Sequence, residues 1–263
     1  MFGKIKHDKG KIKLAEHYAH RGFHDDDKAP ENSLEAFRRA AELGLHTEID
    51  IHRIADGTLV VFHDDTLHRM TGARGYIADY DLSNLRKLRL GGSDERIPTL
   101  DEVLDVFEDS GLSLLIELKV DRGNQKELCK AVAERLKRYK GDYVVQSFYP
   151  RAITEYRKLM PGDVVGQLSK NYFDRKDGAL KVRVAMAGNV LFNRLLRPDF
   201  IAYKFRDRTS KALMRTIKRR GIPRLAWTIR TPDAYKRAVQ AGCIPIFEGF
   251  NPDTISNTLK SEE

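Results

Sequence analysis

The order of apolar and polar positions along the chain predicts alternating helices and strands. Apolar residues at positions 34, 36, 37, 40, 41 and 43 recur at helical spacing, and Ser33 in front of them is a preferred N-cap residue. Residues 47–52 alternate instead, which is the period of a strand and places Glu48, Asp50 and His52 on one face. The pair Asp56–Gly57 then predicts a tight turn into a returning strand at residues 58–62.

After Pro98 the alternation becomes regular. Strands are expected in this part at 112–118, 143–147, 164–168, 200–204, 224–229 and 244–247, and one more is expected near the start of the chain, at 16–20. Further helices are expected at 100–109, 126–138, 150–160, 181–195, 210–220 and 233–241, with a last one from Pro252. About eight strand and helix pairs with short connections predict a parallel α/β fold, and they favour a closed (β/α)8 barrel, the TIM barrel, over an open doubly wound sheet.

The length agrees with one barrel domain over residues 1–263, because such barrels use about 250 residues. Residues 1–15 are a charged lead-in with little periodicity, and residues 53–98 are a loop-rich insertion after the second strand. Hydrophobic residues make up 41% of the chain and charged residues 32%, enough apolar material for a sizeable core under a charged surface.

Charge and cysteine content restrict the class of protein without naming it. The net charge of +9 could attract nucleic acid, anionic lipid headgroups or phosphorylated metabolites, or only keep a basic surface solvated. Aromatic residues do not interleave with the basic runs, so we expect no nucleic-acid partner. Cys129 and Cys243 support neither a disulfide framework nor a zinc motif.

No apolar run is long enough to cross a membrane, and the basic start of the chain has no signal-peptide core. We therefore expect a cytoplasmic protein with no stable membrane insertion, although contact with a lipid surface stays open. The sequence does not indicate an oligomeric state.

Polar residues gather where the predicted strands end. His20 and Arg21 end the first strand, Glu48 and Asp50 lie late in the second, and Glu117 and Gln146 lie late in the strands at 112–118 and 143–147. In a barrel the C-terminal ends of all strands meet at one face, where active sites lie. The sequence therefore predicts that these side chains converge.

Three of these residues are carboxylates, and Glu31 is a fourth nearby candidate. Crowded carboxylates repel one another unless a cation lies between them, and oxygen ligands suit Mg²⁺ or Ca²⁺. The alternative is that Glu48, Asp50 and Glu117 pair with arginines and lysines at the mouth. Glu117 interrupts an apolar strand, where a carboxylate is costly unless it is paired or liganded, and this favours a metal site.

The remaining polar candidates suit phosphoryl chemistry. His20 and His63 both stand at strand ends and are an expected acid and base pair. Arg21 and Lys119 are candidates to neutralise phosphate oxygens, with ion pairing to the same carboxylates as the alternative. Tyr203 and Lys204, at the end of the strand at 200–204, are expected to bias the pocket towards an acidic or phosphorylated headgroup, with a surface or ion-paired role as the alternative. The sequence contains no P-loop, no dinucleotide-binding glycine motif and no nucleophile elbow.

Taken together, the motifs resemble those of the glycerophosphodiester phosphodiesterase family. The matching blocks run in order over most of the chain: H-R-G at 20–22, P-E-N-S at 30–33, E-I-D-I at 48–51, D-G-T-L-V-V-F-H-D at 56–64, L-H-R-M-T-G at 67–72, I-P-T-L-D-E-V at 97–103, I-E-L-K at 116–119, Q-S-F at 146–148 and A-W-T-I at 226–229. The chain departs from the family after the last strand, where it reads E-G-F-N-P at 248–252 instead of a T-D-x-P-like segment.

The resemblance implies a TIM barrel that hydrolyses a glycerophosphodiester to sn-glycerol 3-phosphate and an alcohol. It implies a divalent ion on Glu48, Asp50 and Glu117 with Glu31 close by, and proton transfer by His20 and His63. It also implies that Arg21 and Lys119 hold the phosphate. Gln146 and Trp227 are the expected further contacts to the substrate.

Two other activities stay open at this point. A lysophospholipase D-like activity would need an apolar mouth, for which Tyr76, Phe173, Phe192 and Phe205 are candidates. A non-catalytic basic protein that binds anions is the alternative outside the enzymes, and it predicts binding that weakens steeply with salt.

Overall fold

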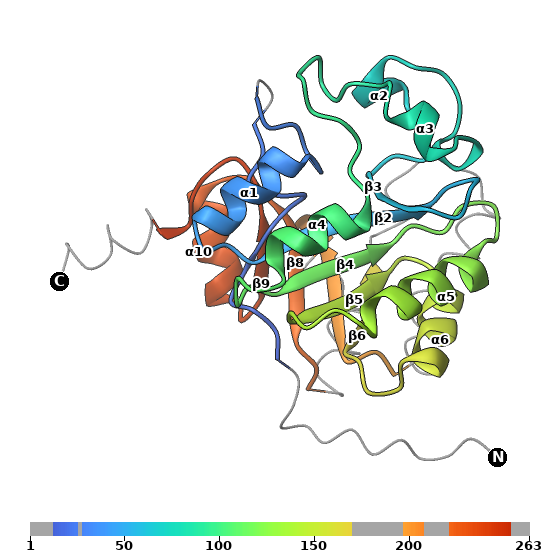
Figure 1. The fold of residues 1–263 in the computed structure, drawn as a ribbon. Coiled ribbons are helices and arrows are strands. Elements are labelled where there is room, and N and C mark those ends of the chain that lie inside the picture. The colour runs from blue at the N-terminus through green and yellow to red at the C-terminus, as the bar shows by residue number, and fades with distance from the viewer. Residues whose placement is uncertain (1–12, 26–27, 170–196, 208–220, 254–263) are drawn as a thin grey trace, which may run out of the picture.

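The structure is a computed structural model that describes residues 13–25, 28–169, 197–207 and 221–253. In this part of the chain, eight parallel strands form one sheet that closes because the first strand pairs with the second and the last (Figure 1). The strands are β1 Tyr18–Ala19, β2 Thr47–Arg53, β4 Leu114–Leu118, β5 Tyr143–Ser147, β6 Val165–Ser169, β7 Phe200–Lys204, β8 Arg224–Ile229 and β9 Ile244–Phe247. The prediction of a closed (β/α)8 barrel is therefore confirmed.

Helices between the strands cover the outside of the barrel. Those described are α1 Leu34–Glu42, α4 Leu100–Phe107, α5 Gln125–Leu136, α6 Pro150–Leu159 and α10 Pro232–Gln240. Ser33 caps α1 by accepting a hydrogen bond from the Ala36 N–H, and Thr99 and Glu102 form a capping box on α4. The helices predicted at 181–195 and 210–220, and nearly all of the one from Pro252, lie outside the described residues.

The insertion after β2 has its own small core. It begins with β3, Leu59–Val61, which runs antiparallel to the end of β2, and continues with α2 His68–Thr71, the 3₁₀ helix η1 Ile77–Asp79 and α3 Leu82–Leu85. Buried residues that include Val60, Leu67, Ile77, Leu85 and Ile97 pack together inside it. Figure 1 shows the insertion beside the end of the barrel where β2 finishes.

The alternation of the strands explains why polar side chains collect at that end. One set of strand residues, including Ile49, Leu114 and Ile201, packs outward under the helices. The opposite set fills the barrel interior: Tyr18, Leu115, Val144, Leu168, Phe200, Ala202, Leu225 and Ile246. Two residues further along the same inward rows come His20, Glu117, Gln146, Trp227 and Glu248. The polar residues from several strands therefore form a layer directly above the apolar interior, at the C-terminal end of the barrel.

Several predicted element ends are wrong by one to three residues. The helix predicted to reach residue 109 ends at Phe107, because a turn begins there in which the Ser110 N–H bonds the Phe107 carbonyl. The strand predicted from residue 112 begins at Leu114, since the Ser113 N–H bonds the His46 ring instead of a neighbouring strand. The first strand has only two residues, Tyr18–Ala19. None of the described helices has the length and apolar character that crossing a membrane requires.

Candidate active site

Three carboxylates meet at the C-terminal end of the barrel. Glu48 and Asp50 come from β2 and Glu117 from β4, where Asp50 and Glu117 are directly paired in the register of the two strands. All three are buried, and one oxygen of each lies within 4.8 Å of the others. The convergence predicted from the strand pattern is present.

The carboxylates do not share the same electrostatic environment. Burial, then the charges of Asp50 and Glu117, raise the pKa of Glu48 well above its usual range. Burial also raises the pKa of Glu117, although Lys119 opposes the shift. For Asp50 burial is outweighed by Lys119, His63 and Arg21, which hold its pKa well below the usual range. Each additional negative charge is therefore costly here, so the trio favours a bound cation.

Two cations already lie against the trio. Lys119 places its Nζ 3.1 Å from a Glu117 oxygen and 3.5 Å from Asp50 Oδ1, and Arg21 Nε lies 3.5 Å from Asp50 Oδ2. The alternative in which the carboxylates form ion pairs with arginine and lysine is thus partly realised. These two cations leave the pKa of Glu48 raised, and Asp50 Oδ1 accepts no hydrogen bond from the described residues. Buried carboxylate oxygens in this arrangement fit a divalent ion.

The loop after β1 is shaped to bring its backbone to Glu48. Arg21 and Gly22 have φ angles of 58° and 88°, and the Arg21 N–H donates to Glu48 Oε2 at 3.1 Å. A Cβ on Gly22 would lie 2.8 Å from the Cβ of Ala36 on α1. Glycine is needed at this position because it tolerates both the positive φ and the close approach of the helix.

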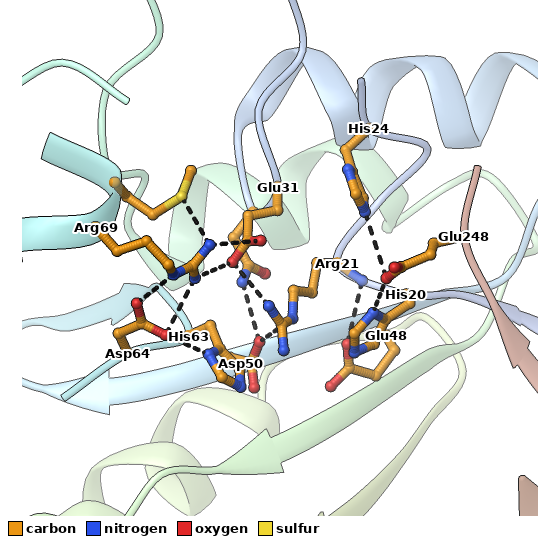
Figure 2. Close-up of polar contacts among 12 residues, drawn as sticks. His20, Arg21, His24, Glu31, Glu48, Asp50, His63, Asp64, Arg69 and Glu248 are labelled. Carbon is orange, nitrogen blue, oxygen red and sulfur yellow. Dashed lines mark hydrogen bonds and ion pairs between the residues drawn. The ribbon is translucent and has the colours of Figure 1, made fainter. Parts of the chain in front are cut away.

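Glu31 lies apart from the trio of carboxylates. Its carboxylate binds two guanidinium groups, Arg21 Nη1 at 2.8 Å and Arg69 Nη2 at 2.6 Å (Figure 2). Asn32, its neighbour, instead donates a hydrogen bond to Asp50 Oδ2 at 3.0 Å. The structure therefore brings Glu31 to the arginines of the site, and Asn32 to the trio.

His20 is backed by Glu248, from the end of β9. The His20 Nδ1 lies 2.6 Å from Glu248 Oε2, and Arg230 donates to the other oxygen of Glu248 at 2.5 Å. Because an ionised carboxylate only accepts, Nδ1 carries the proton and Nε2 keeps its lone pair. Burial lowers the pKa of His20 to about 4, although Glu248 opposes this shift. His20 is therefore a neutral imidazole at neutral pH.

His63 has a similar partner but a more open position. Its Nδ1 lies 2.6 Å from Asp64 Oδ1, and 32% of its side chain is exposed, against 11% for His20. His63 and Arg69, each through a hydrogen bond, outweigh burial and hold the pKa of Asp64 below its usual range. Asp64 is thus ionised, so its histidine also donates from Nδ1, and Nε2 is the ring nitrogen that does not contact Asp64.

The inward rows of β5 and β8 add a polar and aromatic wall. Gln146 pairs with Glu117 in register, and its buried Oε1 has no hydrogen-bond partner among the described residues. The same holds for Nε1 of Trp227, whose ring packs edge-on against Phe148 at 5.7 Å. Tyr203, by contrast, packs in the outward core with its hydroxyl 3.2 Å from Cys243 Sγ, so its expected place beside a headgroup is wrong.

Sequence reasoning missed three residues of the site. Glu248 falls in the segment that departs from the family pattern, and only the inward alternation of β9 would have placed it beside His20. Asn32 and Arg69 lie inside recognised blocks, P-E-N-S and L-H-R-M-T-G, without a role assigned to them. The contacts of Glu248 with His20, of Asn32 with Asp50 and of Arg69 with Glu31 join positions 228, 18 and 38 residues apart, which a pattern along the chain does not show.

The comparisons with known proteins place this barrel among the phosphoric diester hydrolases. The model of the Glycerophosphoryl diester phosphodiesterase family matches residues 20–250, so the chain belongs to that family. A glycerophosphodiester phosphodiesterase from Caldanaerobacter subterraneus subsp. tengcongensis is 29% identical, with 92% of this chain and 96% of that protein covered. The human lysophospholipase D is 33% identical, but the match covers 50% of this chain and 44% of that protein.

A solved structure agrees with this assignment. The phosphodiesterase of Oleispira antarctica, in complex with the product sn-glycerol-3-phosphate, superposes with a TM-score of 0.77 at 27% identity. The match covers 94% of this chain and 97% of that one. The barrel, and not only the individual motifs, is therefore shared with an enzyme of this kind.

Proposed function

We propose that the protein hydrolyses glycerophosphodiesters to sn-glycerol 3-phosphate and an alcohol in a reaction that depends on a divalent metal. The observation that carries the proposal is the buried trio Glu48, Asp50 and Glu117, placed beside two histidines whose Nδ1 atoms each contact a carboxylate, which leaves Nε2 of each ring as the atom for proton transfer. The relative from Caldanaerobacter and the product complex of the Oleispira enzyme support the choice of substrate.

Glu48, Asp50 and Glu117 would hold the ion, which is Mg²⁺ or Ca²⁺ by the oxygen character of the site. A divalent ion supplies positive charge for the phosphoryl oxygens and for the oxygen that attacks phosphorus. Glu31 was a further metal candidate, but its two arginine partners favour a role in orienting Arg21. Asn32 orients Asp50 from the other side.

The other residues bind the substrate and move protons. Arg21 and Lys119 provide the donors for the phosphate, and Gln146 and Trp227 provide unpaired polar atoms for the glycerol side. The glycerol hydroxyl next to the phosphate attacks phosphorus, and one histidine, neutral with its lone pair on Nε2, takes the hydroxyl proton. The other histidine enters the step with both ring nitrogens protonated and gives its Nε2 proton to the departing alcohol as the bond from that alcohol to phosphorus breaks. Water then opens the cyclic phosphate with the two roles reversed.

A substrate panel tests the function. The purified protein is incubated with the glycerophosphodiesters of choline, ethanolamine, inositol and glycerol, each with Mg²⁺, with Ca²⁺ and with a chelator. We expect sn-glycerol 3-phosphate from at least one diester, with activity lost in the chelator and restored by one of the ions. Absence of turnover together with binding of anions that weakens steeply with salt would instead indicate the non-catalytic basic protein.

Direct attack by water is the alternative route for the same reaction. A rapid-quench time course is expected to show a transient cyclic phosphate, and a substrate without the neighbouring hydroxyl is expected to resist hydrolysis. No transient together with full activity on that substrate would rule the cyclic route out.

A second candidate is lysophospholipase D activity, which the similarity to the human lysophospholipase D favours. The described residues give it limited support. Tyr76 is 48% exposed, with Arg122 5.1 Å from its ring, but Phe205 packs against the core outside the barrel. Phe173 and Phe192 lie outside the described residues. Choline release from glycerophosphocholine, compared with release from lysophosphatidylcholine, separates the two activities.

A further inference from the structure

Arg69, on the short helix α2 of the insertion, extends its side chain toward the catalytic end of the barrel. Its guanidinium group binds two carboxylates, each through two hydrogen bonds. Nε and Nη2 donate to Asp64 at 2.5 and 3.0 Å, and Nη1 and Nη2 donate to Glu31 at 3.0 and 2.6 Å. Such two-pronged contacts fix direction as well as distance.

These contacts connect Arg69 to His63 through a single carboxylate. Asp64 Oδ1 accepts from both His63 Nδ1 and Arg69 Nη2, while Asp64 Oδ2 accepts from Arg69 Nε. Both oxygens of Asp64 are therefore engaged, so this carboxylate cannot rotate without breaking a bond to Arg69. In Figure 2, Arg69 lies above Asp64 and His63, and dashed lines join its guanidinium group to Asp64 and to Glu31. A carboxylate held in this way fixes the ring orientation and tautomer of its histidine.

The insertion does not depend on Arg69 for its own folding contacts. Leu67 is buried in the core of the insertion, and Met70 packs against that core. The Thr71 and Gly72 N–H groups bond the carbonyls of Leu67 and His68, and the Met70 carbonyl accepts from the Gly91 N–H. The Arg69 side chain makes four hydrogen bonds to Asp64 and Glu31, the residues that face the site, and one within the insertion, to Met70 Sδ at 3.1 Å. The backbone and the apolar side chains therefore hold α2 in place, and the Arg69 side chain mainly contacts the site.

We propose that Arg69 is a positioning residue that locks Asp64, and through it keeps His63 in the orientation and tautomer needed for proton transfer. The proposal rests on the function proposed above, because it gives the insertion a part in that same reaction. It also gives a function to the insertion, which lies outside the barrel repeat and beside the C-terminal end of β2.

The kinetic test compares Arg69→Met, Arg69→Lys and the matched control Arg86→Met. Arg86 also lies in the insertion and binds a carboxylate, Glu102 at 2.6 Å. Glu102 belongs to the capping box of α4, and the pair does not touch the histidines. We expect Arg69→Met to lower kcat on the order of tenfold to a hundredfold with KM changed less than about threefold, and Arg69→Lys to restore part of the loss. Arg86→Met should keep the wild-type kcat.

Two results would overturn the proposal. One is a kcat of Arg69→Met within about twofold of wild type. The other is a loss that follows from folding or from the metal site: a fall matched by the folded fraction, or an apparent metal affinity that drops as far as kcat. The second case would place the effect on Glu31 and Arg21 instead of on His63.

A measurement that does not depend on turnover distinguishes failure of the positioning role from failure of the proposed hydrolytic function. The ¹⁵N chemical shifts of the His63 ring, recorded at a pH where the ring is neutral, report its tautomer, and we expect the Nδ1–H form in wild type and a mixture with the Nε2–H form in Arg69→Met. If the shifts change but no glycerophosphodiester is hydrolysed by wild type, the proposed function fails and the positioning stands. If wild type is active and the shifts are the same in both proteins, the positioning role fails.

Discussion

At the scale of single residues, the two histidines have the same hydrogen-bond geometry but different exposure. Each donates from Nδ1 to a carboxylate at 2.6 Å, and in each case an arginine holds that carboxylate: Arg230 for Glu248, and Arg69 for Asp64. His20 is buried with a lowered pKa, whereas His63 lies nearer to solvent.

The first prediction concerns removal of either ring. His20→Ala and His63→Ala should keep metal affinity and lose turnover by on the order of a hundredfold or more, because neither ring belongs to the carboxylate trio. Steady-state kinetics and metal titration on the same preparations check this. Turnover retained in either variant would remove that histidine from the mechanism.

The second prediction concerns the proton on His20. An NMR titration of the His20 ring should give a pKa of about 4, below the ordinary value of 6.5, because burial disfavours the charged form. Glu248 raises this pKa, so Glu248→Gln should lower it further. Since the folded pKa lies below the unfolded one, this group contributes stability above about pH 6.5 that is lost as the pH falls toward 4. A His20 that titrates near 6.5 would contradict the account.

At the scale of elements, the strands place the site and the loops complete it. β5, β7, β8 and β9 have the bounds expected from their apolar runs, and the alternation of β2 was enough to predict that Glu48 and Asp50 lie on one face. The partners from loops could not be predicted in this way. Glu248 meets His20 across 228 positions, and Arg69 meets Glu31 across 38, so their contacts depend on how the barrel closes and how the insertion folds.

The third prediction concerns the loop between β1 and α1. Gly22→Ala adds a Cβ 2.8 Å from Ala36 at a φ of +88°, so it should displace the backbone that presents the Arg21 N–H to Glu48. We expect activity to fall at least about tenfold and the free energy of unfolding to fall by more than about 2 kcal/mol. Urea unfolding and kinetics measure the two effects.

Gly44→Ala is the matched control, because its φ is +68° but an added Cβ would meet nothing within 4 Å. Gly44→Ala should lower the free energy of unfolding only by the backbone strain, about 1–2 kcal/mol, and leave kcat unchanged. Equal effects of the two substitutions on kcat would contradict the role given to the H-R-G loop.

At the scale of the whole molecule, the closed barrel gathers negative charge that a cation would relieve. Glu48, Asp50 and Glu117 come from two strands that are neighbours in space but separated by more than fifty positions, and burial keeps water from screening them. The fold and the trio were predictable from one sequence because both follow from strand periodicity. The helices predicted at 181–195 and 210–220 remain predictions, since they fall outside the described residues.

The fourth prediction follows from this crowding. Adding Mg²⁺ or Ca²⁺ at pH 7.5 should raise the unfolding free energy, by about 2.7 kcal/mol when the ion is about a hundredfold above its Kd. The increment should shrink as the pH falls toward 5, because the raised pKa values of Glu48 and Glu117 let protons compete with the ion. Thermal unfolding with and without chelator measures both effects. An increment that does not change with pH would contradict the assignment of these carboxylates.

The most direct test of the central claim is a ³¹P NMR time course on a glycerophosphodiester that the substrate panel identifies, with calorimetric metal binding on the same protein. Wild type should convert the diester to sn-glycerol 3-phosphate with the ion present and stop in chelator, while Glu48→Gln should lose turnover and metal binding together. Hydrolysis by wild type that continues unchanged in chelator, or a Glu48→Gln variant that binds the ion and turns over normally, would contradict the account.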